Sequence, residues 1–428
     1  GLCQRSSIVH GALRDADCAG CGIRKLPHLF PGLSFRLSHH SRSLPQAERI
    51  FLIPSLTLYP QKFLSRPDVL ENEENIVNIG LKYVNNDMCY PIILITGQMI
   101  AALQSGKYDL NRTRLLMPSA GDACRGSNYT GVLRRAVAKA GFPQVKVLAL
   151  NLKGLEKEEQ FQIEPGMVWR ALFGLFYGDI LMALLQQTRP YEAKRGAAEN
   201  IWKKWIRVLS EDIICGKHLT IGHMKRNFKK IAADFRKMQK MDCKKQRIGI
   251  VGEIYIKYCH LGNWNMVRFL EEQGCESHTN GLSWYVMYYM DSHLKESGRM
   301  EALLYKVVLK LFTSLQNAML QSLRQYGFYC MENFATLKKE AQDYVSFHYN
   351  IGDGWLIGGE IVGHVKHDCR KVVAVQPFGC MVNHCCGRGL YPSLQRRMPD
   401  ARMVSVDVDS SGSELNVYNR VKMLVDMK

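Results

Sequence analysis

Three cysteines each occupy a turn beside a predicted element of an α/β pattern. Cys124 follows the β-rich run Arg114–Met117, and Cys380 follows the run Val372–Val375. Cys89 lies in an Asn- and Asp-containing turn just before another apolar run. Turns at the carboxyl ends of strands expose backbone N–H groups, which stabilise a thiolate or a bound ligand. A shared metal or cluster site and buried structural thiols are both compatible with this pattern.

Glycines lie close to two of these cysteines, where free backbone N–H groups would lower a thiol pKa and tune a bound cluster. Gly121 and Gly126 flank Cys124, and Gly379 precedes Cys380. The wide spacing of the three cysteines does not match the compact motifs of ferredoxins. Spacing alone therefore does not decide between the two interpretations.

Cysteine usage predicts a reducing, cytoplasmic environment. The 14 cysteines among 428 residues follow no small-domain disulfide pattern, so we expect free thiols. Cys18 and Cys21 form a C-x-x-C pair that could bind metal together with Cys3, but no second pair has zinc-finger spacing. Adjacent Cys385 and Cys386 are interpreted as structural thiols, because neighbouring cysteines cannot easily bind one iron.

The net charge of +18 is concentrated in one segment, residues 203–247, whose apolar residues recur at helical intervals. We interpret the charges as a solvated helix face or as a docking surface for an acidic partner. Nucleic-acid binding is not favoured, since no recognised nucleic-acid-binding motif accompanies the charge. The apolar run Met167–Leu185 contains Arg170 and Asp179, so a buried helix is expected rather than a membrane span.

The alternation of short β-rich runs with amphipathic stretches predicts an α/β fold with two Rossmann- or flavodoxin-like parallel-sheet lobes joined by a helical segment. The predicted organisation is an irregular segment 1–48, a first lobe 49–165, a helical bridge 166–246, and a second lobe 247–428 with a helical insertion. The predicted strands are Ile50–Ile53, Ile92–Ile95, Arg114–Met117, Val145–Leu150, Ile248–Val251, Val372–Val375 and Met403–Val406.

Five strings in order along the chain carry a family resemblance: KYVNNDMCYPIILITGQ, CRGSNYTGVLRRAVAKAGFPQVKVLALNLKGLE, RIGIVGEIYIKY, DGWLIGGEIV and VQPFGCMVNHCCGRG. Over roughly residues 50–427 the sequence resembles the dehydratase-like region of the 2-hydroxyacyl-CoA dehydratase and activase-related family. The resemblance implies that Cys89, Cys124 and Cys380 hold a [4Fe-4S] cluster, or a related larger cluster, with one iron open to substrate. It also implies low-potential one-electron redox chemistry.

The same resemblance implies partners. Electrons would come from an ATP-dependent activator domain or protein, and an acyl-CoA or another small substrate, a homodimer or a related second subunit are expected. The chain starts without Met, so we expect a fragment or a processed piece of a longer protein in which this region follows an activator. The alternative function is a non-catalytic, electron-accepting or docking module of an activase-like protein.

Further site candidates follow from the matching strings. Glu253, Glu360 and His384 are the candidate catalytic residues. Each of the two carboxylates could instead be a solvated or capping residue, and Asn383 and His384, close to Cys380, could support the cluster ligands. Two departures from the family pattern weaken the transfer of catalysis. The stretch between Ile53 and Asn78 is short, and Asp122 stands where a glycine run is expected.

Overall fold

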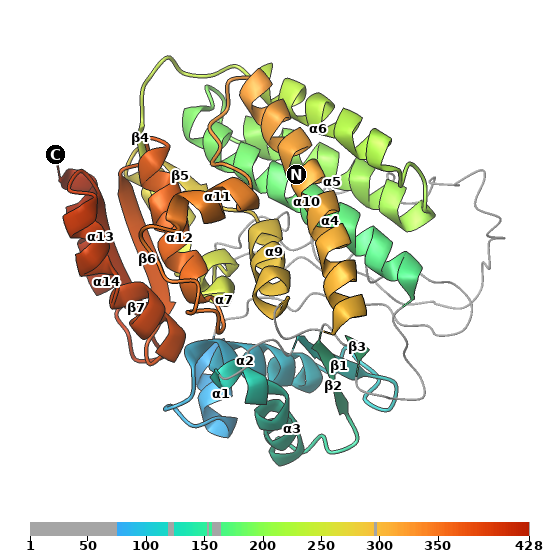
Figure 1. Ribbon diagram of the computed structural model, residues 1–428. Coiled ribbons are helices and arrows are strands. Elements are labelled where there is room, and N and C mark those ends of the chain that lie inside the picture. The colour runs from blue at the N-terminus through green and yellow to red at the C-terminus, as the bar shows by residue number, and fades with distance from the viewer. Residues whose placement is uncertain (1–74, 119–123, 152–153, 156–163, 295–297, 428) are drawn as a thin grey trace, which may run out of the picture. The chain divides into compact units, whose positions relative to one another are not determined.

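A computed structural model describes residues 75–118, 124–151, 154–155, 164–294 and 298–427 (Figure 1). These residues form a mixed α/β structure with two small sheets whose elements pack as one unit. Several sequence predictions fall outside the described residues. They are the segment 1–48 with Cys3, Cys18 and Cys21, the strand Ile50–Ile53, and the positions Gly121 and Asp122.

The larger sheet has four parallel strands in the order β5-β4-β6-β7. Their bounds are β4 Gln246–Gly252, β5 Cys275–Thr279, β6 Lys371–Pro377 and β7 Arg402–Val408. The strands predicted at Ile248–Val251, Val372–Val375 and Met403–Val406 are confirmed as parts of β4, β6 and β7. They could be predicted because these runs are rich in buried β-branched residues. The sequence did not predict β5, since its residues CESHT are mostly polar although all five are buried.

Helices cover both faces of this sheet. Helices α8 Met266–Glu272 and α14 Glu414–Asp426 pack with residues of α1 Ile76–Tyr83 and α2 Tyr90–Gln104 against one face. Helices α12 Gly354–Lys366 and α13 Tyr391–Arg397 pack against the other. A parallel sheet buried on both faces explains the continuous apolar runs in its strands.

The smaller sheet pairs β1 Arg114–Pro118 with β2 Lys146–Asn151 in parallel, and β2 with β3 Gly154–Leu155 in antiparallel. Helix α3 Tyr129–Lys139 shares an apolar cluster with β1, β2 and α2. The runs Arg114–Met117 and Val145–Leu150 were therefore correctly predicted as strands. The first lobe nevertheless has fewer described strands than its sequence pattern suggested.

The predicted strand Ile92–Ile95 is wrong, because these residues belong to helix α2. Ile92, Ile93 and Leu94 are fully buried, so the helix has no polar face to reveal its period. Pro91 in the first turn is compatible with a helix start, where no N–H donor is needed. At the α1–α2 crossing, a Cβ on Gly97 would lie 2.1 Å from the Ile76 carbonyl oxygen, so only glycine permits this approach.

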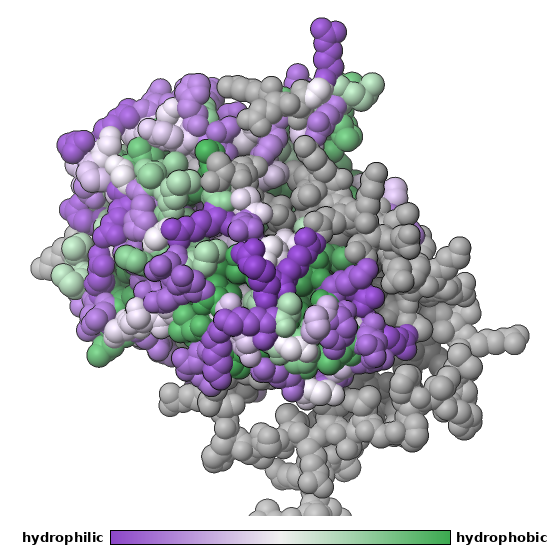
Figure 2. Space-filling view, turned by 90° about the horizontal axis from the view of Figure 1, so that it is seen from below, coloured by the Kyte–Doolittle hydropathy of each residue, from purple (hydrophilic) through white to green (hydrophobic). Residues whose placement is uncertain are grey.

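A further apolar cluster is built mainly from six helices, with Trp355 and Leu356 of α12 added. The six helices are α4 Pro165–Thr188, α5 Ala197–Cys215, α6 Ile221–Arg236, α9 Leu282–His293, α10 Arg299–Gln325 and α11 Phe334–Ala341. The apolar residues of α5 and α6 are buried as the helical period predicted, for example Trp205 and Phe228. Figure 2 shows the molecule from below relative to Figure 1, and on this face hydrophilic side chains are interspersed with apolar ones.

Among the described residues, one stretch, Pro165–Tyr191, is long and apolar enough to cross a membrane by length and composition, and 56% of its most apolar window is buried inside the protein. Within it, the carboxylate of Asp179 accepts hydrogen bonds from the backbone N–H groups of Leu282 (2.8 Å) and Ser283 (3.0 Å) at the start of α9. The packing of α4 is therefore that of a core helix.

Asp179→Asn should flatten the dependence of stability on pH. Burial raises the pKa of Asp179 from 3.8 to about 6, so this carboxyl favours the folded state below pH 4, and that contribution is lost as pH rises to 6. The loss is about 3 kcal/mol. Urea unfolding at pH 4 and pH 7 should show a smaller loss of free energy in the variant. Equal losses in both proteins would contradict this assignment.

Candidate functional site

The candidate site lies at the carboxyl ends of β4 and β6, where the order of the larger sheet reverses. The chain leaves β4 to form β5 on one side, and β6 lies on the other side of β4. Such a reversal opens a crevice in which α/β proteins place ligands. Glu253 directly follows β4, and Cys380 follows β6 after a turn in which Gly379 has φ 71°.

In the structure, Cys89 is close enough to Cys124 and Cys380 for the three thiols to interact electrostatically. Cys89 precedes α2 as its N-terminal cap residue, and Cys124 precedes the short helix η2 Arg125–Asn128. Burial raises the pKa of Cys89, and the thiols of Cys380 and Cys124 raise it further. Three segments that are distant in the chain, at the starts of α2 and η2 and after β6, therefore contribute to this site.

Hydrogen-bond donors reach each of the three sulfurs. The backbone N–H of Gly126 donates to Cys124 Sγ at 3.3 Å, and the Asn383 amide donates to Cys380 Sγ at 3.3 Å. A side-chain hydrogen bond with Tyr129 lowers the pKa of Cys89. Such donors stabilise thiolates and tune the electronic properties of a bound metal group.

Two buried carboxyl groups face the cysteines. Glu253 raises the pKa of all three thiols, and Asp353 raises those of Cys124 and Cys380. Burial is the main cause in each case, and it brings the pKa of Cys380 to about 12. Burial also raises the pKa of both carboxyl groups. The thiols therefore hold their protons at neutral pH unless a cation replaces them.

Backbone geometry fixes Glu253 in place. Gly252 has φ 134°, and a Cβ there would lie 1.8 Å from the carbonyl oxygen of Val375 in β6. The next residue, Glu253, caps α7 Ile254–Tyr258 by accepting from the Ile256 N–H at 2.8 Å. Glu253 is therefore a capping residue, which was one of the alternatives expected from the sequence. Its carboxyl group also faces the cysteines.

The side chain of Asn383 connects Cys380 to Asp353. Asp353 was not predicted from the sequence as a site residue. The Asn383 amide donates to Asp353 Oδ2 at 3.3 Å as well as to Cys380 Sγ, and Asp353 Oδ1 accepts from the Ile254 N–H at 3.2 Å. Asp353 is the first residue of the string DGWLIGGEIV, so an acidic residue ahead of a buried glycine-rich helix was its only sequence signal.

The residues after Cys380 form a π-helix, Asn383–Arg388, a feature frequent at functional sites. His384 is half-buried and packs its ring edge-on to Phe378, at 6.4 Å between centroids. Cys385 is exposed and Cys386 is buried. The His384 ring thus packs on Phe378, while its backbone N–H donates to the Cys380 carbonyl oxygen at 3.0 Å.

Glu360 forms a buried ion pair. Lys257 Nζ lies 2.9 Å from Glu360 Oε1 and 3.1 Å from Oε2, and both side chains are at most 3% exposed. The Asn280 amide, just after β5, also donates to Glu360 Oε1 at 3.4 Å. Glu360 thus joins three segments of the larger sheet, which is a structural role.

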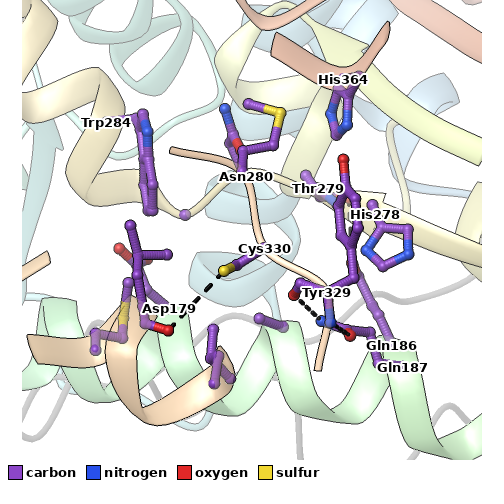
Figure 3. Close-up of a pocket in the computed structure, with 16 residues that line it drawn as sticks. Asp179, Gln186, Gln187, His278, Thr279, Asn280, Trp284, Tyr329, Cys330 and His364 are labelled. Carbon is purple, nitrogen blue, oxygen red and sulfur yellow. Dashed lines mark hydrogen bonds between the residues drawn. The ribbon is translucent and has the colours of Figure 1, made fainter. Parts of the chain in front are cut away.

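A cavity of about 40 Å³ lies between α4, β5, α9, α10 and α12, and Asn280, which donates to Glu360, is among its lining residues. Figure 3 shows Asp179, Asn280 and His364 among its lining residues. Both ring nitrogens of His364 and the Tyr329 hydroxyl are buried without protein hydrogen-bond partners. The volume suits about three water molecules, which these atoms could bind.

The three sulfurs are not arranged as a single-ion site. Among the described residues, the one group of three or more His, Cys, Asp or Glu ligand atoms within 4.8 Å of one another is formed by Asp212, His218 and His223. A cluster with several irons spaces its sulfur ligands more widely than one ion does. Sulfur donors are used by both zinc sites and iron-sulfur clusters, so the donor set alone does not name the metal group.

Comparisons with known proteins leave the family open. No model of a known protein family matches the sequence, and no curated protein matches it.

Lys257→Met should be strongly destabilising, because it leaves the Glu360 carboxylate buried without its cation. The expected loss is about 3–5 kcal/mol in the free energy of unfolding. The double variant Lys257→Met/Glu360→Gln should recover part of this loss. Urea titration measures all three proteins.

Lys422→Met is the matched control, because Lys422 is 53% exposed and pairs with Asp426 at 3.8 Å on the surface. Its cost should be less than about 1 kcal/mol. Equal costs for the Lys257 and Lys422 variants would contradict the structural role of the buried pair.

Proposed function

We propose that Cys89, Cys124 and Cys380 hold a [4Fe-4S] cluster, or a related larger iron-sulfur cluster, as in 2-hydroxyacyl-CoA dehydratase-like proteins. The observation that carries the proposal is the proximity of the three thiols at the strand-order reversal, where each sulfur has a hydrogen-bond donor. A bound cluster would supply low-potential one-electron redox chemistry and one iron without a protein ligand.

The proposal extends to the fold. Taken in chain order from β4, the larger sheet has the order 2-1-3-4, which is the start of the flavodoxin-like order. The smaller sheet, with parallel β1 and β2 and helix α3, would be the remnant of a second lobe of this kind. The helical segment 166–246 would then join two Rossmann- or flavodoxin-like lobes.

The residues around the thiols suggest how the site would work. Gly126 and Asn383 donate hydrogen bonds that stabilise sulfur ligands in a reduced state. Burial raises the pKa values of Glu253 and Asp353, which favours their protonated forms, and these could deliver protons to a nearby substrate. Catalytic roles for Glu253 and His384 belong to this proposal, whereas Glu360 is assigned to the ion pair.

Partners and location are proposed on the same basis. An ATP-dependent activator would donate the electron, and an acyl-CoA or another small molecule would bind at the open iron. A homodimer or a related second subunit would complete the enzyme in the cytoplasm.

The non-catalytic docking module is the second candidate, and the basic faces of α5 and α6 favour it. Exposed Lys203, Arg207, Lys229 and Lys230 form part of a charged surface suited to an acidic partner. Substrate reduction by the reconstituted protein with a chemical reductant would support the enzyme. Electron acceptance without substrate turnover would support the module.

Anaerobic reconstitution followed by iron and sulfide analysis tests the cluster. The wild-type protein should hold about four irons and four sulfides per chain. Cys124→Ala should lose most of both, whereas the control Cys385→Ala should retain them, because Cys385 is exposed and is not one of the proposed ligands. A metal-free wild type, or full retention in Cys124→Ala, would refute the proposal.

A further inference from the structure

A second group of side chains that could ligate a metal lies in the turn between α5 and α6. It offers nitrogen and oxygen atoms, whereas the cysteine site offers sulfur. One ligand atom from each of Asp212, His218 and His223 lies within 4.8 Å of the other two. The three residues come from a single short stretch of chain, in which α5 and α6 are joined by a short turn.

The turn places the two histidines by its backbone. Gly216 ends α5 in the left-handed region with φ 65°, and His218 is also left-handed with φ 58°. A non-glycine residue in this region is uncommon and marks a position that the surrounding structure enforces. Thr220 then caps α6 by accepting from the backbone N–H of His223 at 3.3 Å. The first turn of α6 therefore holds His223 beside the loop that carries His218.

The loop is tied to the rest of the helical cluster. The indole N–H of Trp169 in α4 donates to the Leu219 carbonyl oxygen at 3.0 Å, and the Lys217 N–H donates to the Asp212 carbonyl oxygen at 2.8 Å. These bonds reduce the freedom of the loop between the two histidines. A ligand set that is ordered before binding loses less entropy when a metal arrives.

In the metal-free arrangement the ligands bind each other. His218 Nδ1 lies 2.9 Å from Asp212 Oδ1, and the His218 and His223 rings stack at 4.4 Å with 15° between their planes. A metal must lie in the plane of each ring that binds it, so one ring has to leave the stack. The His218 side chain is 55% exposed and has room to rotate.

His223 lies among cationic side chains at the start of α6. Burial lowers its pKa, and the charges of His218, Arg226 and Lys230 lower it further. Arg226 approaches Nδ1 of the ring at 3.5 Å. The same cations oppose a bound metal ion, and the Asp212 carboxylate offsets this repulsion.

We propose that Asp212, His218 and His223 bind one divalent transition-metal ion of the zinc type. Two imidazole nitrogens and one carboxylate oxygen suit Zn²⁺ and its neighbours in the first row, and the four residues between the histidines match a common zinc-ligand spacing. Three protein ligands leave a position open to water or to a partner's side chain. The bound ion cross-links the end of α5 to the start of α6.

Cobalt titration of the full-length protein tests the site, because Co²⁺ bound by nitrogen and oxygen lacks the sulfur-to-metal charge-transfer band of thiolate sites. The wild-type protein should bind one equivalent of Co²⁺ without that band, and Zn²⁺ should displace it. His223→Ala and Asp212→Asn should bind this equivalent at least about tenfold more weakly. Zn²⁺ should also raise the melting temperature of the wild type more than that of either variant.

His348→Ala is the matched control, because His348 is an exposed histidine outside the turn and should leave the equivalent unchanged. His218→Ala removes an exposed side chain and serves as a second variant whose folding is not at risk. The same nitrogen- and oxygen-bound stoichiometry and affinity in wild type, His223→Ala and His218→Ala would overturn the proposal. The result does not depend on whether the cysteines hold iron, because their site gives the sulfur band.

Discussion

The buried ion pair between Lys257 and Glu360 is the interaction on which the larger sheet and the candidate site depend. Lys257 is in α7, directly after β4, and Glu360 is in α12, directly before β6. Asn280, which follows β5, donates to the same carboxylate. Three connections of the parallel sheet therefore meet at one acid. A buried pair tolerates little displacement, because either ion left alone carries a large desolvation cost.

This arrangement determines the electrostatics of the cysteine site. The positive charge of Lys257 lowers the pKa of Glu253, of Asp353 and of Asp179, but burial outweighs it and all three values are raised. The thiols face mainly acids and hydrogen-bond donors, so protons occupy them until a cation arrives. Metal binding must therefore release protons, and its affinity should fall as pH falls.

The sequence was informative where burial and residue type agree, and misleading where they conflict. The apolar, β-branched runs of β4, β6 and β7 identified their strands, and the turns after them located Cys380 and Glu253. In the mostly polar β5 and in the wholly apolar start of α2, apolar residues do not alternate with polar ones at a spacing that distinguishes a strand from a helix. Asp353 and Lys257 were not found, because their roles arise from contacts between residues that are distant in the chain.

The two proposed metal sites are formed by different parts of the fold. This difference explains why the cysteine site was predicted from the sequence and the histidine site was not. Cys89, Cys124 and Cys380 come from three distant segments, so their site exists only when both sheets are packed, but their turns are recognisable as motifs. Asp212, His218 and His223 lie within one helix-turn-helix, yet nothing in the letters shows that His218 adopts φ 58° and turns its ring toward Asp212. Partial unfolding that separates the sheets should therefore abolish the cysteine site before it affects the histidine turn.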